Sequence, residues 1–370
     1  MTDHPLTLRA LNRATLARQM LLERATRSIS EGIEHLVGLQ AQYPASPYIG
    51  LWSRLAGFTR ADLDALIDSR RVVRATFQRA TLHLLTAADY LRFRGTIQTV
   101  LDSAQESIAK QRIKDGSAPF DRDALLAAAR TFLNDQPRTF AEITTYFGER
   151  LPDVDAGIIR YTIRTQIPLV QVPTNSTWRY PGSPAFTLAE TWLGTPIPTE
   201  PDVKGLIRRY LAAFGPATLS DIQTWSGLAK LNAEEAALSA DLRTYRGEGK
   251  ITYLDLPDAP LPDAETPAPV RFLPEFDNLL LAHTKRTRVI ADVHRKKVFL
   301  PGLRVAATFL IDGFVAGVWT TAVKKGEATL TLEPFVPLTK LTYTALSEEG
   351  ERLIRLVAAE AKTFAVRISE

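Results

Sequence analysis

The sequence contains no cysteine and only five histidines. Without thiols the chain can form neither disulfides nor thiolate metal sites, and the histidines are not spaced as metal ligands. We therefore expect no metal ion and no cofactor. The N-terminus lacks the pattern of a signal peptide, and the chain has no apolar run of about 18 residues, which a membrane helix needs. These absences predict a cytoplasmic protein without a membrane partner.

Arginine is distributed unevenly. Residues 1–100 hold 13 arginines and no lysine against 8 acidic residues, and residues 271–325 hold 10 basic against 4 acidic residues. The planar guanidinium group binds phosphates and base edges through paired hydrogen bonds. This distribution favours a nucleic acid as partner over the role of a protein-interaction scaffold. Solvated arginines that merely reflect a GC-rich genome stay open as the alternative.

The middle of the chain repeats one order of elements: a helix, a capped helix, a third helix and a short hairpin. Proline-rich stretches at 181–201 and 257–269 are expected to be linkers. The repeated order is typical of winged helices. We predict an α+β fold, mainly α, with three tandem winged-helix units and a small C-terminal antiparallel β module. The predicted boundaries are 1–118, 119–200, 201–258 and 271–370.

Several element predictions bear on the site. We expect helices at 13–24 and 30–39, a capped helix from 59, strands at 72–77 and 80–85, and one long helix from 86 towards 113. The wing of the second unit is expected from strands at 169–172 and 177–180. The C-terminal module is expected from strands at 305–311, 314–323 and 328–335, closed by a helix at 347–364.

The tripeptide Gln40-Ala41-Gln42 follows a predicted helix and precedes Pro44. Proline disfavours helical geometry in the residue before it, so the tripeptide is expected in a turn or an extended form. In an extended form Gln40 and Gln42 point the same way, with Ala41 turned inward. Two adjacent amides can then hold a water or span the edges of a base. From spacing alone, ordinary polarity at a helix end is the favoured explanation of the pair.

The chain resembles the AlkZ-type (AlkZ/YcaQ-like) DNA glycosylases, a winged-helix family. The similar strings follow the family's order along most of the chain: Leu36–Pro44, Pro47–Arg54, Arg79–Leu84, Phe272–His283 and Ile311–Trp319. The resemblance implies a monofunctional DNA glycosylase that hydrolyses the N-glycosidic bond of bulky N7-alkylated purines. Some family members also unhook interstrand crosslinks. The implied partner is double-stranded DNA with alkylated bases, bound by a nucleoid-associated monomer.

The family's catalytic motif is glutamine, an aliphatic residue, then glutamine or aspartate, and it falls on Gln40, Ala41 and Gln42. This chain has the double-glutamine form and lacks the carboxylate, which weakens a role as general base. Alkylation at N7 already makes the purine a cationic leaving group, so a positioned water suffices. We expect Gln42 to hold that water and Gln40 to orient it or to contact the sugar.

Basic residues in two regions are predicted to contact DNA phosphates, with solvated surface charge as the alternative. They are Arg54, Arg70, Arg71, Arg74 and Arg79 in the first region, and Lys285, Arg286, Arg288, Arg295, Lys296 and Lys297 in the second. Asp277 lies in an apolar stretch and invites a role behind the catalytic pair, although a buried partner of an arginine is the favoured interpretation. His83 and His283 are weaker candidates for that role, because lone histidines beside apolar residues usually belong to the core.

A non-catalytic winged-helix transcriptional regulator is the competing interpretation. In that case the glutamines would read base edges of one operator sequence. A regulator would protect one sequence and leave alkylated DNA intact, whereas a glycosylase would release modified bases with little sequence preference.

Overall fold

The computed structural model describes residues 5–369 and divides into two units. The first unit joins three separate stretches: the N-terminal segment through Arg60, Ile207–Trp225, and the segment from Lys230 onwards. The second unit contains Ala61–Leu206 with Ser226–Ala229. The predicted boundaries group the chain differently, and the number of winged-helix units stays a prediction. Among the described residues, no helix is long and apolar enough to cross a bilayer.

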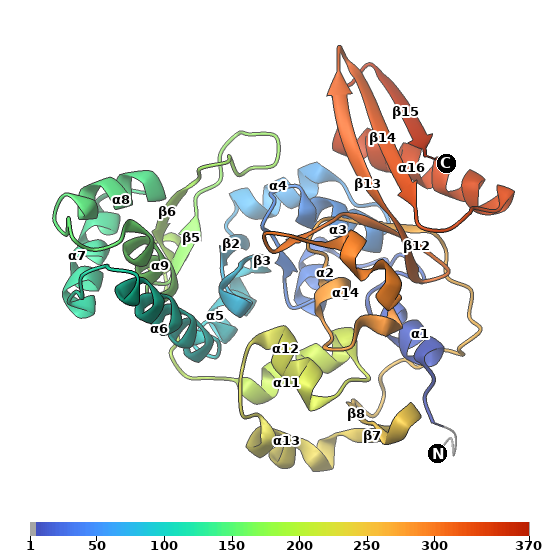
Figure 1. The fold of residues 1–370 in the computed structure, drawn as a ribbon, viewed down its shortest axis with the longest axis horizontal. Helices are drawn as coiled ribbons and strands as arrows, with labels where there is room; N and C mark the ends of the chain where they lie inside the picture. Colours follow the sequence, from blue (N-terminus) through green and yellow to red (C-terminus); the bar gives the residue numbers. More distant parts are fainter. Residues whose placement is uncertain (1–4, 370) are drawn as a thin grey trace. The chain divides into compact units, whose positions relative to one another are not determined.

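The first unit contains the N-terminal helices and a five-stranded sheet (Figure 1). Its N-terminal elements are α1 (Leu8–Arg18), α2 (Ile29–His35), β1 (Leu39–Gln40) and α3 (Ser46–Arg54). Its central elements include most of α11 (Val203–Phe214) and α12 (Leu219–Ser226), then α13 (Asn232–Leu238), β7 (Arg243–Arg246) and β8 (Thr252–Asp255). Its C-terminal elements are β9 (Arg271–Leu273), α14 (Asn278–Leu281), α15 (Arg295–Val298), β10 (Phe299–Leu300), β11 (Arg304–Val305), β12 (Thr308–Ile311), β13 (Phe314–Lys324), β14 (Glu327–Pro334), α16 (Lys340–Val357) and β15 (Thr363–Ile368).

The sheet has the order β15-β14-β13-β12-β9. Alternate residues of β14 are buried, and Leu330 and Leu332 pack against Leu346, Leu353 and Ile354 of α16. This alternation is what one covered sheet face requires. A second apolar cluster joins α1 to α14. It consists of residues from both ends of the chain: Leu16, Leu21, Leu273, Leu279, Leu280, Val289, Ile290, Val298, Val305, Leu310 and Val315. The core of the first unit therefore fixes α14, which contributes residues to the candidate functional site.

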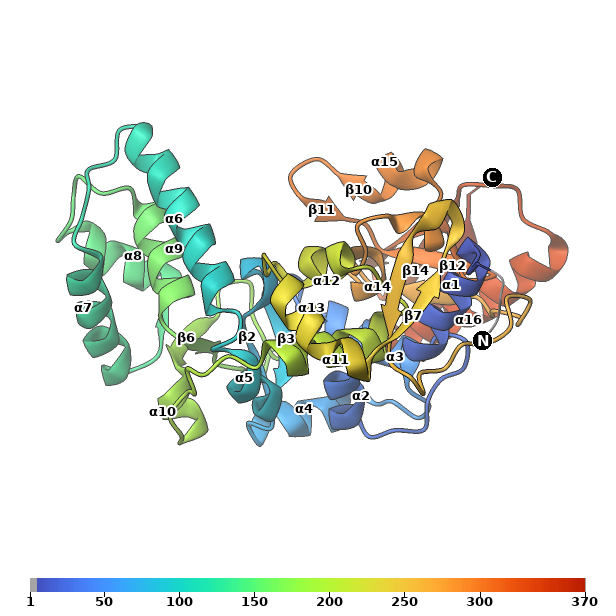
Figure 2. The same cartoon turned by 90° about the horizontal axis from the view of Figure 1, so that it is seen from below.

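The second unit contains α4 (Arg60–Asp68) after its first residue, β2 (Val72–Thr76), β3 (Leu82–Thr86), α5 (Ala87–Phe93), α6 (Gln98–Lys114), α7 (Arg122–Asp135), β4 (Arg138–Thr139), α8 (Phe140–Gly148), α9 (Ala156–Gln166), β5 (Leu169–Gln171), β6 (Ala185–Leu188) and α10 (Ala189–Leu193). Figure 2 shows α7, α8 and α9 close together, and apolar side chains of these three helices form one core. Its strands follow the order β3-β2-β5-β6-β4. Residues 119–200 show the three predicted helices and a pair of antiparallel strands, and the predicted capping box of Thr139 and Glu142 is present.

Three predicted elements in this unit are wrong. The long helix from 86 is interrupted at Gly95, where a Cβ atom would lie 2.7 Å from the backbone oxygen of Thr199. The stretch 177–180 is no strand, because Thr174 N–H bonds back to the Arg179 carbonyl and Arg179 is left-handed (φ 62°). The second wing strand is β6, so the stretch 181–201 is no simple linker, since it also holds α10.

The closing helix is also displaced from its predicted position. Thr339 caps α16, because its hydroxyl accepts the Thr342 N–H at 3.2 Å, so the helix begins at Lys340. It ends at Val357, and the chain then forms β15, parallel to β14. The three predicted antiparallel strands of this module are present, and residues 257–269 contain neither helix nor strand, as a linker requires.

Candidate functional site

The chain reverses sharply just before the glutamine motif. The capping box of Ser28 and Glu31 starts α2. The helix then ends in two left-handed residues, Val37 (φ 55°) and Gly38 (φ 83°). Glycine adopts this conformation without cost, but a β-branched residue does so only under strain. Strain of this kind gathers at functional sites, and here it directs β1 out of the helix.

Asn278 holds the motif in register. Its Oδ1 accepts the Gln40 backbone N–H at 3.2 Å, and its Nδ2 donates to the Gly38 carbonyl at 2.7 Å. One side-chain amide thus replaces the pair of hydrogen bonds that a neighbouring strand would make. Asn278 is the first residue of α14. Because the core fixes α14, the hydrogen bond from Asn278 also fixes the backbone of Gln40.

A buried ion pair supports this clamp. Asp277 caps α14 through the Leu279 N–H and binds both terminal nitrogens of Arg54 at 2.8 and 2.9 Å. Arg54 also donates to the Gly50 carbonyl and to Gln19 Oε1. Both side chains of the pair are nearly inaccessible. Asp277 is therefore the buried partner of an arginine, as favoured from the sequence, whereas Arg54 is corrected from a DNA contact to a core residue.

The two glutamines differ in exposure. Gln40 is only 6% exposed and Ala41 is fully buried, as expected for Ala41, but Gln42 is exposed. The extended conformation ends at Gln40. Beyond it the chain turns towards α3, and the turn is closed by a hydrogen bond from the Ser46 N–H to the Tyr43 carbonyl. Gln42 therefore does not share the environment of Gln40. The ring of Tyr43, beside Gln42, lies 5.9 Å from that of Phe276.

Gln40 lines a cavity of about 10 Å³ in the first unit. The other lining residues come from α2, β1, α3 and the segment before α14: Leu36, Leu39, Ser46, Arg54, Pro274, Phe276, Asp277 and Asn278. Glu275 lies in the same segment, and burial raises the pKa of its carboxyl group. The cavity is large enough for about one water molecule.

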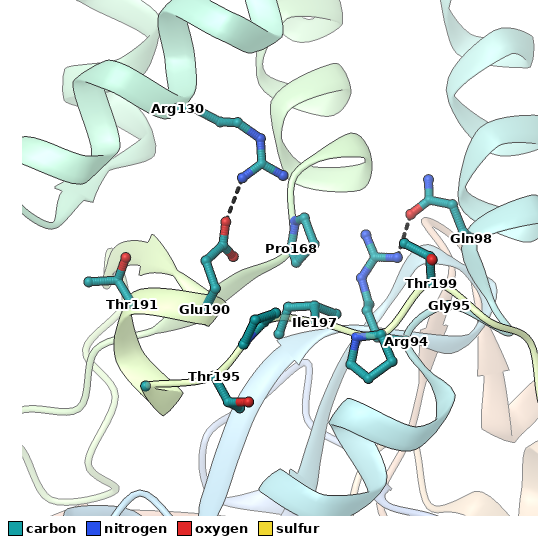
Figure 3. A pocket seen from close by; sticks show the side chains of 13 residues that line it. Arg94, Gly95, Gln98, Arg130, Pro168, Glu190, Thr191, Thr195, Ile197 and Thr199 are labelled. Carbon is teal, nitrogen blue, oxygen red and sulfur yellow. Dashed lines mark hydrogen bonds and ion pairs between the residues drawn. The ribbon is translucent and has the colours of Figure 1, made fainter.

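A larger hollow of about 580 Å³ lies in the second unit (Figure 3). Arg130 pairs with Glu190 at 2.5 Å, and Arg94 donates a hydrogen bond to the Gln98 side-chain oxygen. Neither glutamine of the motif lines it. The small cavity beside Gln40 therefore remains the candidate site.

The predicted DNA contacts separate by exposure. Arg71, Lys285, Arg295, Lys296 and Lys297 are exposed, as is Arg70, which stacks on the Trp192 ring at 4.2 Å. Arg79 is half-buried and left-handed (φ 52°), and Arg286 is half-buried over Phe299.

Arg74 and Arg288 are buried and are corrected to structural roles. Arg74 bonds Gln171 and lies over the Tyr180 ring at 5.2 Å. Arg288 donates to the Pro216 carbonyl at 2.9 Å. A phosphate cannot reach a side chain that is only 3% exposed without rearrangement of the fold.

The two histidines are core residues. Burial, together with the charge of Arg79, lowers the pKa of His83 to about 3. Burial likewise lowers the pKa of His283 to about 3, with a further contribution from Arg288. His283 Nε2 donates to the Phe214 carbonyl at 3.0 Å. Both rings are neutral at physiological pH, and neither lines the cavity beside Gln40.

Sequence reasoning missed Asn278, Ser46 and Gln19. Asn278 could have been found, because it is a second polar residue inside the apolar string that was already noted for Asp277. Gln19 carries no such signal, since its partner Arg54 is distant along the chain, and Ser46 is a lone serine at the start of α3.

Comparison with known proteins is consistent across sequence and fold. A model of the "DNA glycosylase AlkZ-like" family matches residues 33–356. An "Interstrand DNA cross-link repair glycosylase" of Streptomyces sahachiroi is 26% identical, over 95% of this chain and 96% of that protein. The solved structure of Streptomyces sahachiroi DNA glycosylase AlkZ shares the fold, with a TM-score of 0.77 at 23% identity, over 99% of this chain and 100% of that one. Because the family model covers most of the sequence, the chain belongs to the AlkZ-like family and is a DNA glycosylase, a hydrolase of N-glycosyl bonds.

Proposed function

We propose that the protein removes N7-alkylated purines from double-stranded DNA and unhooks crosslinks that join such purines. The observation that carries this proposal is the pairing of an anchored amide with an exposed one. Asn278 fixes the backbone of Gln40, while Gln42, two residues on, is exposed. The similar Streptomyces sahachiroi protein is an interstrand DNA cross-link repair glycosylase, which supports the crosslink activity.

The chemistry suits amides because the substrate is already cationic. When the bond between C1′ and N9 breaks, its electron pair neutralises the alkylated purine, so the leaving group needs no proton. A water oxygen forms the new bond to C1′ and loses its proton to solvent. Gln42 holds this water, and Gln40 orients it or contacts the sugar. Oriented dipoles of this kind stabilise the developing charge without having to reorganise.

The exposed cations of the first unit provide the proposed surface for the DNA backbone. Lys285 precedes the buried Arg288, and Arg295, Lys296 and Lys297 belong to the short helix α15. Arg70 and Arg71 provide exposed charge in the second unit. Such contacts position the duplex but carry no sequence information.

The test is excision from duplexes that carry one N7-methylguanine or one bulkier N7 adduct, scored as alkali-labile abasic sites. We expect Gln42→Ala to slow single-turnover excision by about 10²-fold or more, in the range of a positioned catalytic group. Gln111→Ala, in an exposed part of α6, is the matched glutamine control and should excise at the wild-type rate. Wild-type excision rates for both Gln40→Ala and Gln42→Ala would overturn the proposal.

A further inference from the structure

Three arginines of the first unit gather around one buried carboxylate. Glu349 of α16 is only 1% exposed. One of its oxygens accepts from Arg24 Nη2 at 2.5 Å, and the other accepts from Arg352 Nε at 2.9 Å. Arg271, the first residue of β9, lies close enough for its charge to interact with all three of these groups. The cluster therefore holds three positive charges against one negative charge.

Arg271 lacks acceptors for most of its donors. The residue is 8% exposed, and its only hydrogen bond among residues 5–369 runs from Nη1 to the Val270 carbonyl at 3.2 Å. Its Nε is buried without a partner. Burial, together with the charges of Arg24 and Arg352, lowers the pKa of Arg271 to about 10. The guanidinium group is therefore still charged at physiological pH, without a counterion of its own.

The missing partner of Arg271 is an anion rather than a water. Within the described part of the chain, Glu349 is the only carboxylate that forms an ion pair with Arg24 or Arg352, and none forms one with Arg271. A water would satisfy the free Nε but would leave the charge unbalanced. Buried charges without a partner are costly, so the imbalance favours a negatively charged ligand.

The donors of the cluster suit a phosphate group. Guanidinium groups bind phosphate oxygens through parallel N–H donors, and the planar fork matches the geometry of the oxyanion. The side chains of Arg24 and Arg352 are 23% and 61% exposed, so an anion can reach the cluster from solvent. The excess of positive charge matches a ligand with one or two negative charges.

We propose that Arg24, Arg271 and Arg352 bind one phosphate group, with Arg271 as the buried anchor. Two sources supply this chemistry: the backbone of duplex DNA, and free phosphate. The strand β9 leads into the segment that lines the cavity beside Gln40, which places the cluster on the unit that carries the candidate site. The inference concerns binding alone, so it does not depend on the catalytic roles proposed for Gln40 and Gln42.

Urea denaturation of the full-length protein in phosphate-free buffer tests the free anion. Sodium phosphate is added at matched ionic strength to wild type, Arg271→Met and Arg355→Gln. We expect the wild-type midpoint to rise with the logarithm of the phosphate concentration, once this exceeds the dissociation constant. Arg271→Met should lose this rise. Arg355→Gln is the matched control and should respond like wild type, because Arg355 is an exposed arginine of α16 that pairs with Glu351.

Fluorescence anisotropy with undamaged duplex DNA at several salt concentrations tests the DNA backbone as the source. A backbone phosphate in the site predicts that Arg271→Met reduces the slope of log affinity against log salt by about 0.9, the contribution of one phosphate. Arg355→Gln should keep the wild-type slope. Because no base is excised in this measurement, its result is independent of the proposed glycosylase activity.

The two measurements separate the sources. A lost phosphate response with an unchanged slope supports the site and assigns it to free phosphate, whereas a reduced slope supports the site and assigns it to DNA. The inference is overturned if Arg271→Met behaves like wild type in both assays, including the case in which phosphate stabilises both proteins equally by exclusion from their surfaces. Should Arg271→Met fail to fold, Arg352→Gln, whose side chain is exposed, takes its place, and wild-type behaviour of that variant in both assays overturns the inference.

Discussion

Breaking the buried ion pair of Arg54 and Asp277 is expected to cost the fold much of its free energy of unfolding. Arg54 and Asp277 are both buried and make two parallel hydrogen bonds. Removing two charges from water is costly, and the bidentate geometry with further partners offsets that cost. The pair ties α3 to the first residues of α14, on either side of Gln40. Its role is to hold two segments that lie 223 residues apart in the sequence.

Replacing Asp277 with asparagine should destabilise the fold strongly. Arg54 would stay buried with its charge uncompensated, so we expect the free energy of unfolding to fall by about 3–5 kcal/mol. Urea denaturation measures this change. Glu351→Gln is the matched control, because Glu351 pairs with Arg355 on the exposed side of α16 and such pairs contribute about 0.5 kcal/mol. Equal stability of Asp277→Asn and wild type would contradict this account of the pair.

Replacing Asn278 with alanine should impair catalysis beyond its effect on stability. The Gly38 carbonyl and the Gln40 N–H would lose their partner, at a cost of about 1–3 kcal/mol each when buried. We expect slower excision at temperatures where the variant is still fully folded, because the Gln40 backbone loses the contact with Asn278 that helps to hold it in register. Asn134→Ala, exposed near the end of α7, should keep the wild-type rate. A folded Asn278→Ala protein with wild-type excision would show that the clamp is dispensable.

At the scale of elements, the sequence correctly predicted a helix start that depends on hydrogen bonds between residues close together along the chain. The capping box of Thr139 and Glu142 gave the start of α8 correctly, because both hydrogen bonds lie within four residues. The start of α16 depends on a cap of the same kind at Thr339, which the Glu-rich pattern obscured. β15 was missed because a parallel partner, β14, is reached only after a whole helix. The bend at Arg179 depends on a left-handed residue that sequence pattern does not reveal.

The basic run from Lys285 to Lys297 should separate into DNA contacts and structural residues. We expect Lys296→Gln together with Lys297→Gln to weaken DNA binding and to reduce the slope of log affinity against log salt by about 2, since each phosphate contact contributes about 0.9. Arg288→Met is the contrast within the same run: it should lower stability and leave the slope unchanged, because Arg288 is buried. Fluorescence anisotropy at several salt concentrations measures the slope. An unchanged slope in the lysine variant would remove α15 from the DNA surface.

At the scale of the whole molecule, the first unit is assembled from three stretches that are separated along the chain. The predicted domains were contiguous, as periodicity and linkers suggest, and such signals cannot indicate which distant segments share a core. The candidate site illustrates this limit. Gln40 and Gln42 were predicted as the catalytic pair through the family strings, and Asp277 was predicted to pair with an arginine. Only the folded structure shows that this arginine is Arg54, which lies on the helix after the motif.

Acid should destabilise the molecule through its buried histidines. Burial lowers the pKa of His83 to about 3 in the folded state, whereas the unfolded value is about 6.5. The unfolded state therefore binds the proton first. The stabilisation is fully present above pH of about 6.5 and is lost as pH falls towards 3, by up to about 1.4 kcal/mol per pH unit.

The contribution of His83 can be isolated by comparing His83→Gln with wild type. Urea denaturation between pH 7 and pH 5 should give a shallower pH dependence of the free energy of unfolding for the variant. Parallel curves for His83→Gln and wild type would show that His83 is not held neutral by burial.

The most direct test of the central claim is single-turnover release of N7-methylguanine from duplex DNA by wild type, Gln40→Ala and Gln42→Ala. DNA binding is measured in parallel. The account predicts that both variants bind the duplex like wild type and excise the base far more slowly, and that unmodified guanine is not released by any of the three. Excision at the wild-type rate by both variants would contradict the assignment of catalysis to Gln40 and Gln42.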